Sequence, residues 1–404
     1  MKYIIVLGDG MADEPINALG GRTPLQVATT PSMDFLAKNG KLGLLETVPN
    51  GFHPGSEIAN LSVLGYDVAK VFEGRGSLEA ASMGIEINHD EMAMRCNLIC
   101  IENGKIKNHS AGHISNEEAF ELISYLQQEL GDDIISFYPG ISYRHLLKIK
   151  NADKRILCTP PHDVPGTSFN DVLIKPQVED AIETATLIND LILRSQELLS
   201  SHPINKKRIL EGKDPANSIW PWSPGYKPSM QKLSDLYGIS KGVVISAVDL
   251  IRGIGVYAGL TPINVEGATG LYDTNYEGKV NAAIEALKGD ADFVFLHIEA
   301  SDEAGHEGDV DLKIKTIEYL DSRVLKPLLN ALNVIDDDVT IALLPDHPTP
   351  CRLRTHTSQP VPFLIYHKGI DADNVDKFDE ISAQKGEFKL IKGDEFIKSM
   401  IIKK

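Results

Sequence analysis

The stretch FVFLHIEASDEAGHEGD, residues 293–309, decides the fold of this chain. It begins as an apolar run without polar alternation, which predicts a strand that is buried on both faces. It then changes abruptly into acidic residues, two glycines and a histidine, and carboxylate and imidazole groups are common metal ligands. We therefore interpret this stretch as a core strand whose end carries a metal site.

Three further apolar runs have the same character: YIIVLG (3–8), VTIALLP (339–345) and VPFLIY (361–366). Helical stretches lie between such runs, for example at 30–40 and 311–332. Strands that alternate with helices at both ends of the chain predict an α/β domain, in which helices cover both faces of a parallel sheet.

The middle of the chain follows a different pattern. Residues 94–110 predict a β-hairpin that turns at the Asn-Gly pair 103–104. Residues 116–131 predict an amphipathic helix capped by Asn116, and residues 143–150 predict another strand. An α+β module therefore interrupts the α/β pattern.

A chain of 404 residues is too long for one ordinary domain, and we predict two. Residues 1–67 and 258–404 form the α/β domain, and residues 68–257 form the inserted domain.

The overall charge limits the partners of the protein. A formal net charge of −17 argues against a general binder of nucleic acid or anionic membranes, although a local cationic cluster still permits a small anionic substrate. The four cysteines form no CxxC pair, so neither a zinc ribbon nor a disulfide framework is expected. The opening MKYIIVLGDG is too short for a signal peptide or a membrane span, so we expect a cytoplasmic protein. The oligomeric state stays open.

Three of the apolar runs end at a carboxylate, namely Asp9, Asp302 and Asp346. Because the carboxyl ends of parallel strands meet at one edge of a sheet, where ligands bind, we expect these groups to lie together. Three histidines accompany them in sequence, and they are His306, His347 and His356. Taken singly, each residue has an ordinary explanation as a turn, cap or loop residue. Together they suffice for two divalent cations.

Ser56 lies in HPGSEIANLSVLGYD, residues 53–67, where it follows a Pro-Gly turn and opens an apolar helical run. One interpretation is an ordinary N-cap serine. The other is a nucleophile, since a helix N-terminus favours phosphate and a divalent cation activates a serine hydroxyl. The accompanying ligand set favours the nucleophile.

The inserted segment contains candidates for anion recognition: Arg75, Arg95, His109, His113, Arg144, His162 and Asp163. The arginine fork suits phosphate and carboxylate, although most arginines are solvated surface charges. His109 and His113 follow a strand rather than a helix, which argues against a separate metal site there. The glycine-rich pieces match neither the P-loop nor the dinucleotide fingerprint, which argues against a kinase or a dehydrogenase.

Taken together, LGDGMAD, GSEIANLSVLGYD, SDEAGHEGD, PDHPTP and THTSQPVP resemble the alkaline phosphatase superfamily. More closely, the chain resembles the cofactor-independent phosphoglycerate mutases of the archaeal type, over nearly its whole length. The resemblance implies a metal-binding phosphatase-like domain interrupted by a substrate-handling domain. The loops after the Asp-His pair at 346–347 and around His356 differ from strings common in the family, but both changes spare the presumed ligands.

Carried over by motif, the resemblance implies that Ser56 becomes phosphorylated. One ion would be held by Asp9, Ser56, Asp346 and His347, and the other by Asp302, His306 and His356. Mn²⁺ is the expected metal, with Mg²⁺, Zn²⁺ or Co²⁺ as alternatives. The implied reaction interconverts 3-phosphoglycerate and 2-phosphoglycerate, and it needs neither 2,3-bisphosphoglycerate nor a nucleotide.

The expected partner is this small-molecule substrate, with neither nucleic acid nor membrane. From their positions in the sequence, we expect the substrate to be bound by Arg75, His109, Arg144, His162 and Asp163 of the insertion. We expect Lys279, from the other domain, to approach the phosphoryl group. The competing hypotheses are a metal-dependent phosphohydrolase, a phosphopentomutase and a catalytically silent metal-binding scaffold. A scaffold would be expected to lose the nucleophile or the ligands, and all of them are present.

Overall fold

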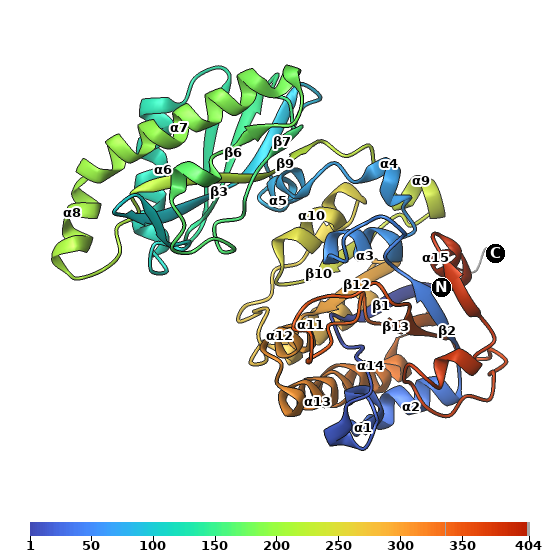
Figure 1. Ribbon diagram of the computed structural model, residues 1–404. Helices are drawn as coiled ribbons and strands as arrows, with labels where there is room; N and C mark the ends of the chain where they lie inside the picture. Colours follow the sequence, from blue (N-terminus) through green and yellow to red (C-terminus); the bar gives the residue numbers. More distant parts are fainter. Residues whose placement is uncertain (336, 402–404) are drawn as a thin grey trace. The chain divides into compact units, whose positions relative to one another are not determined.

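The structure is a computed structural model that describes residues 1–335 and 337–401 (Figure 1). The chain forms two compact units, and each is described here by itself. The larger unit contains Met1–Phe72 and the chain from Ser229 onward, and the inserted unit contains Glu73–Pro228. Within the described residues, every helix is too short or too polar to span a lipid bilayer.

A central sheet of eight strands organises the described part of the larger unit. In spatial order the strands are β11 (Thr261–Pro262), β10 (Gly242–Ile245), β12 (Phe293–Ile298), β1 (Lys2–Gly8), β13 (Val339–Leu344), β14 (Val361–Tyr366), β2 (Lys41–Glu46) and β15 (Lys389–Lys392). Every neighbouring pair is parallel except the two that involve β14. The mostly parallel sheet confirms the predicted α/β class.

The expectation that residues 361–366 run parallel to the other strands is wrong. After β13 the chain returns through residues 345–360, which contain neither a helix nor a strand, and β14 then pairs antiparallel with β13 and β2. A parallel pair needs a crossover of a dozen or more residues, usually with a helix, to bring the chain back to the same end of the sheet. Here no helix carries the chain back.

The helices of the larger unit are α1 (Pro24–Val27), α2 (Pro31–Lys38), α3 (Ser56–Val63), α4 (Val68–Val71), α9 (Leu233–Tyr237), α10 (Asp249–Tyr257), α11 (Tyr276–Lys288), α12 (Ala300–Glu307), α13 (Val310–Tyr319), α14 (Lys326–Ala331) and α15 (Glu395–Met400). Figure 1 shows α2, α11, α13 and α14 on one side of the sheet and α3 and α10 on the other. The predicted helix at 311–332 is interrupted by a π-helical turn at Leu320–Leu325, so it forms two shorter α-helices.

The core of the larger unit lies between the sheet and these helices. All seven residues of β1 and all six of β12 and β13 are buried, as the unbroken apolar runs predict. On one face, Ile4 and Val6 of β1 pack in the same cluster as Met33, Tyr276 and Leu320. The central strands are therefore rigid supports for whatever their ends carry.

The inserted unit contains the strands β3 (Glu91–Glu102), β4 (Lys105–Asn108), β5 (Ile135–Ile141), β6 (Arg144–Lys150), β7 (Ile156–Leu157), β8 (Lys175–Pro176) and β9 (Ser218–Tyr226). Its helices are α5 (Arg75–Ser82), α6 (Asn116–Leu130), α7 (Ile182–Ser201) and α8 (Pro203–Leu210). β3 lies between β6 and β9 and pairs antiparallel with both, so this sheet is antiparallel.

Local signals predicted part of the inserted unit well. β3 and β4 form the predicted hairpin, and Asn103 and Gly104 both take positive φ, of 50° and 74°, as an Asn-Gly turn requires. The predicted helix after it is α6, but the predicted cap is wrong. Ser115, not Asn116, accepts a hydrogen bond from the N–H of Glu118 and caps the helix.

Residues 229–257 lie in the larger unit, although the sequence analysis assigned them to the insertion. The reason is β10, which lies in this range and pairs parallel with β12 of the central sheet. The connection from the inserted unit back to the sheet therefore comes about thirty residues earlier than expected, between Pro228 and Ser229.

Candidate active site

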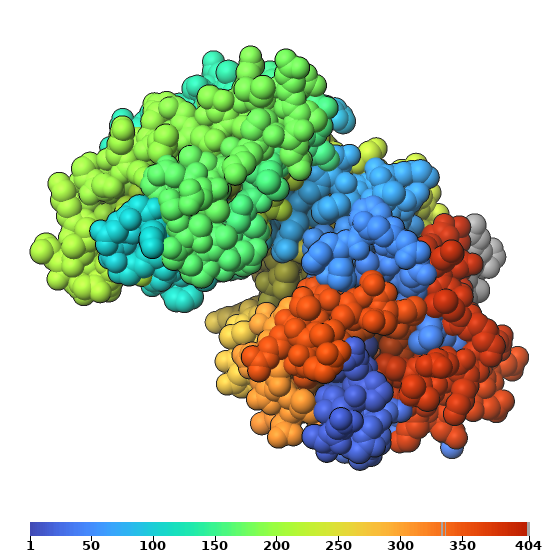
Figure 2. All heavy atoms as spheres, viewed as in Figure 1, coloured from blue at the N-terminus to red at the C-terminus, as the bar shows by residue number. Residues whose placement is uncertain are grey.

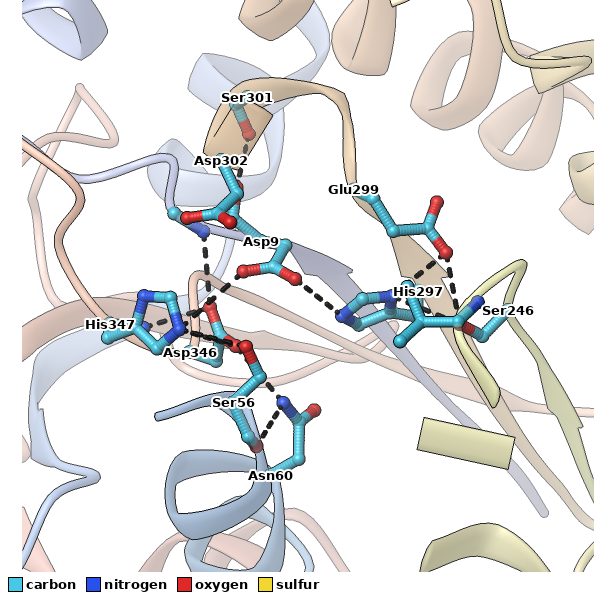
Figure 3. Close-up of polar contacts among 12 residues, drawn as sticks. Asp9, Ser56, Asn60, Ser246, His297, Glu299, Ser301, Asp302, Asp346 and His347 are labelled. Atoms are coloured by element: carbon cyan, nitrogen blue, oxygen red, sulfur yellow. Dashed lines mark hydrogen bonds and ion pairs between the residues drawn. The ribbon is translucent and has the colours of Figure 1, made fainter. Parts of the chain in front are cut away.

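Three adjacent strands of the central sheet carry the predicted carboxylates. β1 pairs with both β12 and β13, so the carboxyl ends of these strands meet at one edge of the sheet. Asp9 follows β1 directly, Asp346 follows β13, and Asp302 lies in the first turn of α12, just after β12. Their exposed fractions are 5%, 0% and 9%. Figure 3 shows the three carboxylates converging.

One half of the site consists of Asp302, His306 and His356. The Nε2 atom of His306 lies 3.2 Å from Asp302 Oδ2, and that of His356 lies 3.3 Å from Asp302 Oδ1. The two Nε2 atoms are only 2.9 Å apart. The Nδ1 atom of His306 contacts the carbonyl oxygen of Arg354 at 3.1 Å, and that of His356 contacts the carbonyl oxygen of Pro54 at 2.9 Å.

These contacts decide the tautomers of His306 and His356. A carbonyl oxygen only accepts, so each Nδ1 carries a proton, and each ring turns its Nε2 atom toward Asp302 and toward the other ring. A divalent cation bound there would take the place of the Nε2 protons, and second-shell carbonyls hold metal-bound histidines in this way. The residues present therefore fit a divalent cation.

The loop that carries His356 is anchored against the start of α3. The bond from His356 to Pro54 joins these segments. Figure 2 shows them side by side on the surface, the blue segment around residue 55 next to the orange-red segment around residue 355.

The other half of the site consists of Asp9, Asp346, His347 and Ser56. His347 Nε2 lies 3.3 Å from Asp346 Oδ2, 3.7 Å from Asp9 Oδ1 and 3.1 Å from Ser56 Oγ. Its Nδ1 lies 3.3 Å from the hydroxyl of Thr349, which itself donates to Asp302 Oδ1. Thr349 therefore orients ligands of both halves, although it was not among the residues predicted from the sequence.

Ser56 is the first residue of α3, and Gly55 is the N-cap. Ser56 is therefore not the cap, which removes the ordinary explanation for this serine. Asn60, one turn later, donates to the carbonyl oxygen of Ser56 at 2.8 Å and to Asp346 Oδ2 at 3.0 Å. This side chain fixes the first turn of α3 against the strand-end carboxylates (Figure 3).

Burial and crowding shift the pKa values of the site. Burial, and after it the neighbouring Asp346 and Asp302 carboxylates, raise the pKa of Asp9 well above its usual range. Burial also opposes ionisation of Asp302, but hydrogen bonds from His306 and His356 hold its pKa well below the usual range. The hydrogen bond to Asp302 raises the pKa of His306 to about 9, and burial lowers that of His347. Crowded carboxylates of this kind are stabilised by a bound cation.

Lys279 lies in the same unit but is completely buried. It pairs with the Glu299 carboxylate and donates to the carbonyl oxygen of His297 at 3.3 Å. His297 and Glu299 were also missed by the sequence analysis. The available signal was a histidine inside an otherwise apolar strand and an acid immediately after it.

The anion-recognition candidates of the inserted unit gather around Trp222. The Arg95 guanidinium stacks 4.2 Å from the Trp222 ring, and the His162 ring lies 5.3 Å from it. His109 lies 6.0 Å from His162, and its ring also contacts Tyr143. Burial lowers the pKa of both histidines.

Arg75 and Arg144 lie close enough to Arg95 to lower the pKa of its guanidinium, an effect to which burial contributes most. Asp163 lies at the exposed margin, 3.6 Å from His162 Nε2. The sequence candidates of the inserted unit thus form one cationic cluster. Asp163 is its acidic member.

Solved structures share this fold. Over 99% of this chain and 96% of the other, the structure matches the PH0037 protein from Pyrococcus horikoshii with a TM-score of 0.82 and 31% sequence identity. It also matches the cofactor-independent phosphoglycerate mutase from Thermoplasma acidophilum with a TM-score of 0.69 and 26% identity, over 99% of both chains. The fold is that of a class of α/β phosphomutases.

Sequence comparison narrows the class to a family. The family model for 2,3-bisphosphoglycerate-independent phosphoglycerate mutase matches residues 37–205. A protein of that name from Methanosarcina barkeri is 52% identical over 399 residues, which cover 98% of each chain. The chain belongs to the family of 2,3-bisphosphoglycerate-independent phosphoglycerate mutases, and it is an isomerase. The resemblance drawn from the motifs is confirmed.

Proposed function

We propose that this enzyme interconverts 3-phosphoglycerate and 2-phosphoglycerate through a phosphoserine at Ser56, without free 2,3-bisphosphoglycerate. The observation that carries the proposal is the position of Ser56 Oγ, 3.1 Å from His347 Nε2, at the first residue of a helix fixed to the carboxylate cluster. Family membership supplies the substrate. A surface serine without this setting would be a poor nucleophile at neutral pH.

We assign two divalent cations to this site, with Mn²⁺ as the first choice and Mg²⁺, Zn²⁺ or Co²⁺ as alternatives. Asp302, His306 and His356 would hold one, and Asp9, Ser56, Asp346 and His347 would hold the other. Bound cations favour the ionised serine and offset the charge of the phosphoryl oxygens. The facing Nε2 atoms of His306 and His356, 2.9 Å apart, support this assignment.

The proposed reaction then proceeds in two phosphoryl transfers, first to Ser56 and then back to glycerate. Ser56 Oγ loses its proton and forms a bond to phosphorus as the bond to the 3-oxygen of the substrate breaks. That oxygen takes up a proton, so glycerate is formed. The 2-hydroxyl of the same glycerate then loses its proton and attacks the phosphoserine, and Ser56 recovers its own proton. No proton, electron or phosphate is gained or lost overall.

Recognition of the substrate is assigned to the remaining candidates. Arg75, Arg144, His109 and His162 suit the carboxylate, because guanidinium groups and the N–H of a neutral imidazole donate hydrogen bonds to carboxylate oxygens. Asp163 suits a hydroxyl. Lys279 supports the phosphoryl end, where its pair with Glu299 holds it against the strand ends.

The test is an enolase-coupled assay with 3-phosphoglycerate and Mn²⁺, without 2,3-bisphosphoglycerate, in which released phosphate is measured in parallel. The proposal predicts formation of 2-phosphoglycerate with little free phosphate. Ser56→Ala should abolish turnover. Ser62→Ala, at a buried serine later in α3, is the control and should leave turnover largely intact. Phosphate release without 2-phosphoglycerate would instead identify a phosphohydrolase.

A further inference from the structure

His297 is a completely buried histidine in β12, and the proposed mechanism does not use it. Its Nδ1 atom lies 3.2 Å from Glu299 Oε1, and the hydroxyl of Ser246 donates to the same oxygen at 3.0 Å. Burial opposes ionisation of Glu299, but the pair with Lys279 holds its pKa at about 2. Glu299 is therefore an acceptor, and Nδ1 of His297 carries the proton.

The other ring nitrogen of His297 points toward the active site. Nε2 lies 3.1 Å from Asp9 Oδ2, as Figure 3 shows, yet it makes no hydrogen bond to any residue that the structure describes. A proton on Nε2 would not point at Asp9 closely enough to form such a bond. Asp9 Oδ1 likewise accepts no hydrogen bond from the described residues. The Nε2 atom thus faces a buried carboxylate at a distance that a cation bound to both groups would also satisfy.

His297 therefore repeats the arrangement of His306 and His356. In each case an acceptor holds Nδ1–H, and Nε2 is turned toward a carboxylate of the cluster. A carboxylate behind a histidine is a common second-shell partner of a metal ligand, because it fixes the tautomer and makes the ring a better donor. The ligand atoms of Asp9, His297 and Asp346 also lie within 4.8 Å of one another.

We propose that His297 binds a divalent cation through Nε2, together with Asp9 and Asp346, and that Glu299 is the positioning residue that orients its ring. The donor set of one imidazole and two carboxylates suits Mn²⁺, Zn²⁺ or Co²⁺. Asp9 turns Oδ1 toward His347, at 3.7 Å, and Oδ2 toward His297, so this carboxylate links the two imidazoles. The inference rests on the proposed cation site but not on the identity of the reaction.

The test uses the full chain loaded with Co²⁺, which shifts the NMR signals of imidazole N–H protons on bound histidines far outside the normal range. The inference predicts shifted Nδ1–H signals from four residues: His297, His306, His347 and His356. His297→Gln should remove one signal and weaken Co²⁺ affinity at least tenfold, as measured by competition with a chromophoric chelator. Loss of a second-shell partner alone costs about 10- to 100-fold, so the number of shifted signals, and not the affinity, distinguishes a ligand from a positioning residue.

His145→Gln is the matched control, because His145 is also buried but lies in the inserted unit and accepts from the N–H of Gly140 through Nδ1. This variant should retain all four signals and the wild-type affinity. Equal spectra and affinities for wild type and His297→Gln would overturn the role of His297. Only three shifted signals in the wild type would also overturn the role of His297, even if the variant does not fold. Absence of any shifted signal would instead contradict the proposed cation site.

Discussion

Thr349 joins the two halves of the active site, and its hydroxyl gives a sharp prediction. The side chain is completely buried, donates to Asp302 Oδ1 and accepts from His347 Nδ1 at 3.3 Å. Thr349→Val preserves the shape of the side chain, including the methyl group that packs against Gly305. It removes both orienting hydrogen bonds at once.

We expect Thr349→Val to weaken cation affinity by about 10- to 100-fold, the usual effect of losing a second-shell partner of a metal ligand. This corresponds to about 1.4–2.7 kcal/mol of binding free energy. The size agrees with the loss of one hydrogen bond to a charged acceptor, about 1.5–3 kcal/mol. Titration of metal-free protein with Mn²⁺ in the presence of a competing chelator measures this directly.

Two variants control the Thr349 experiment. Thr349→Ser keeps the hydroxyl and should bind cations nearly as tightly as the wild type. Thr340→Val makes the same exchange at a buried threonine of β13 whose hydroxyl has no hydrogen-bond partner among the described residues, so it should leave cation affinity unchanged. Wild-type cation affinity in Thr349→Val would refute the reasoning, because the hydroxyl would then not be needed to orient Asp302 and His347.

Three further predictions concern stability. Burial raises the pKa of Glu380 to about 7, and the group accepts from Thr23 and from the N–H of Asp13. The folded state therefore binds the proton more tightly than the unfolded state, so stability falls as pH rises from about 4.5 to 7, by at most about 3 kcal/mol. Denaturant unfolding should show this fall in the wild type but not in Glu380→Gln, and identical pH curves would contradict it. Lys279→Met leaves the Glu299 carboxylate buried without its cationic partner, and should lower the free energy of unfolding by about 3–5 kcal/mol. The double variant Lys279→Met/Glu299→Gln should recover part of this loss. Equal stabilities of the single and double variants would show that the pair does not matter. Gly76→Ala places a Cβ 2.2 Å from the carbonyl oxygen of Ala93, so it should destabilise the inserted unit by about 1–3 kcal/mol. An unchanged thermal midpoint would mean that α5 shifts away without cost.

The sequence predicted those parts of the site that follow from the ends of strands. Asp9 and Asp346 each come directly after an unbroken apolar run, and parallel pairing of β1 and β13 brings such ends together. His356 was predicted as a ligand, although it ends no apolar run and lies ten residues beyond Asp346. Its position depends on the bond to Pro54, a contact between segments about three hundred residues apart that no local pattern encodes.

The residues that were missed leave no mark on the local sequence patterns. His297 lies inside a run that was interpreted as apolar, and a single polar side chain there did not alter the strand pattern. Thr349 looks like any loop threonine until the fold places it between Asp302 and His347. The second domain boundary was misplaced because β10 is only four residues long, too short a run to stand out as a strand of the central sheet.

The central claim is that the phosphoryl group passes through Ser56, and the most direct measurement is to find it there. Enzyme turning over ³²P-labelled 3-phosphoglycerate with Mn²⁺ is quenched in acid, digested with trypsin and sequenced by fragmentation of the peptide 42–70. Fragmentation is needed because Ser62 lies in the same peptide. The account predicts label on Ser56 that appears only when the cation is present and is absent in Ser56→Ala. Full mutase turnover by Ser56→Ala, or label confined to another residue, would contradict it.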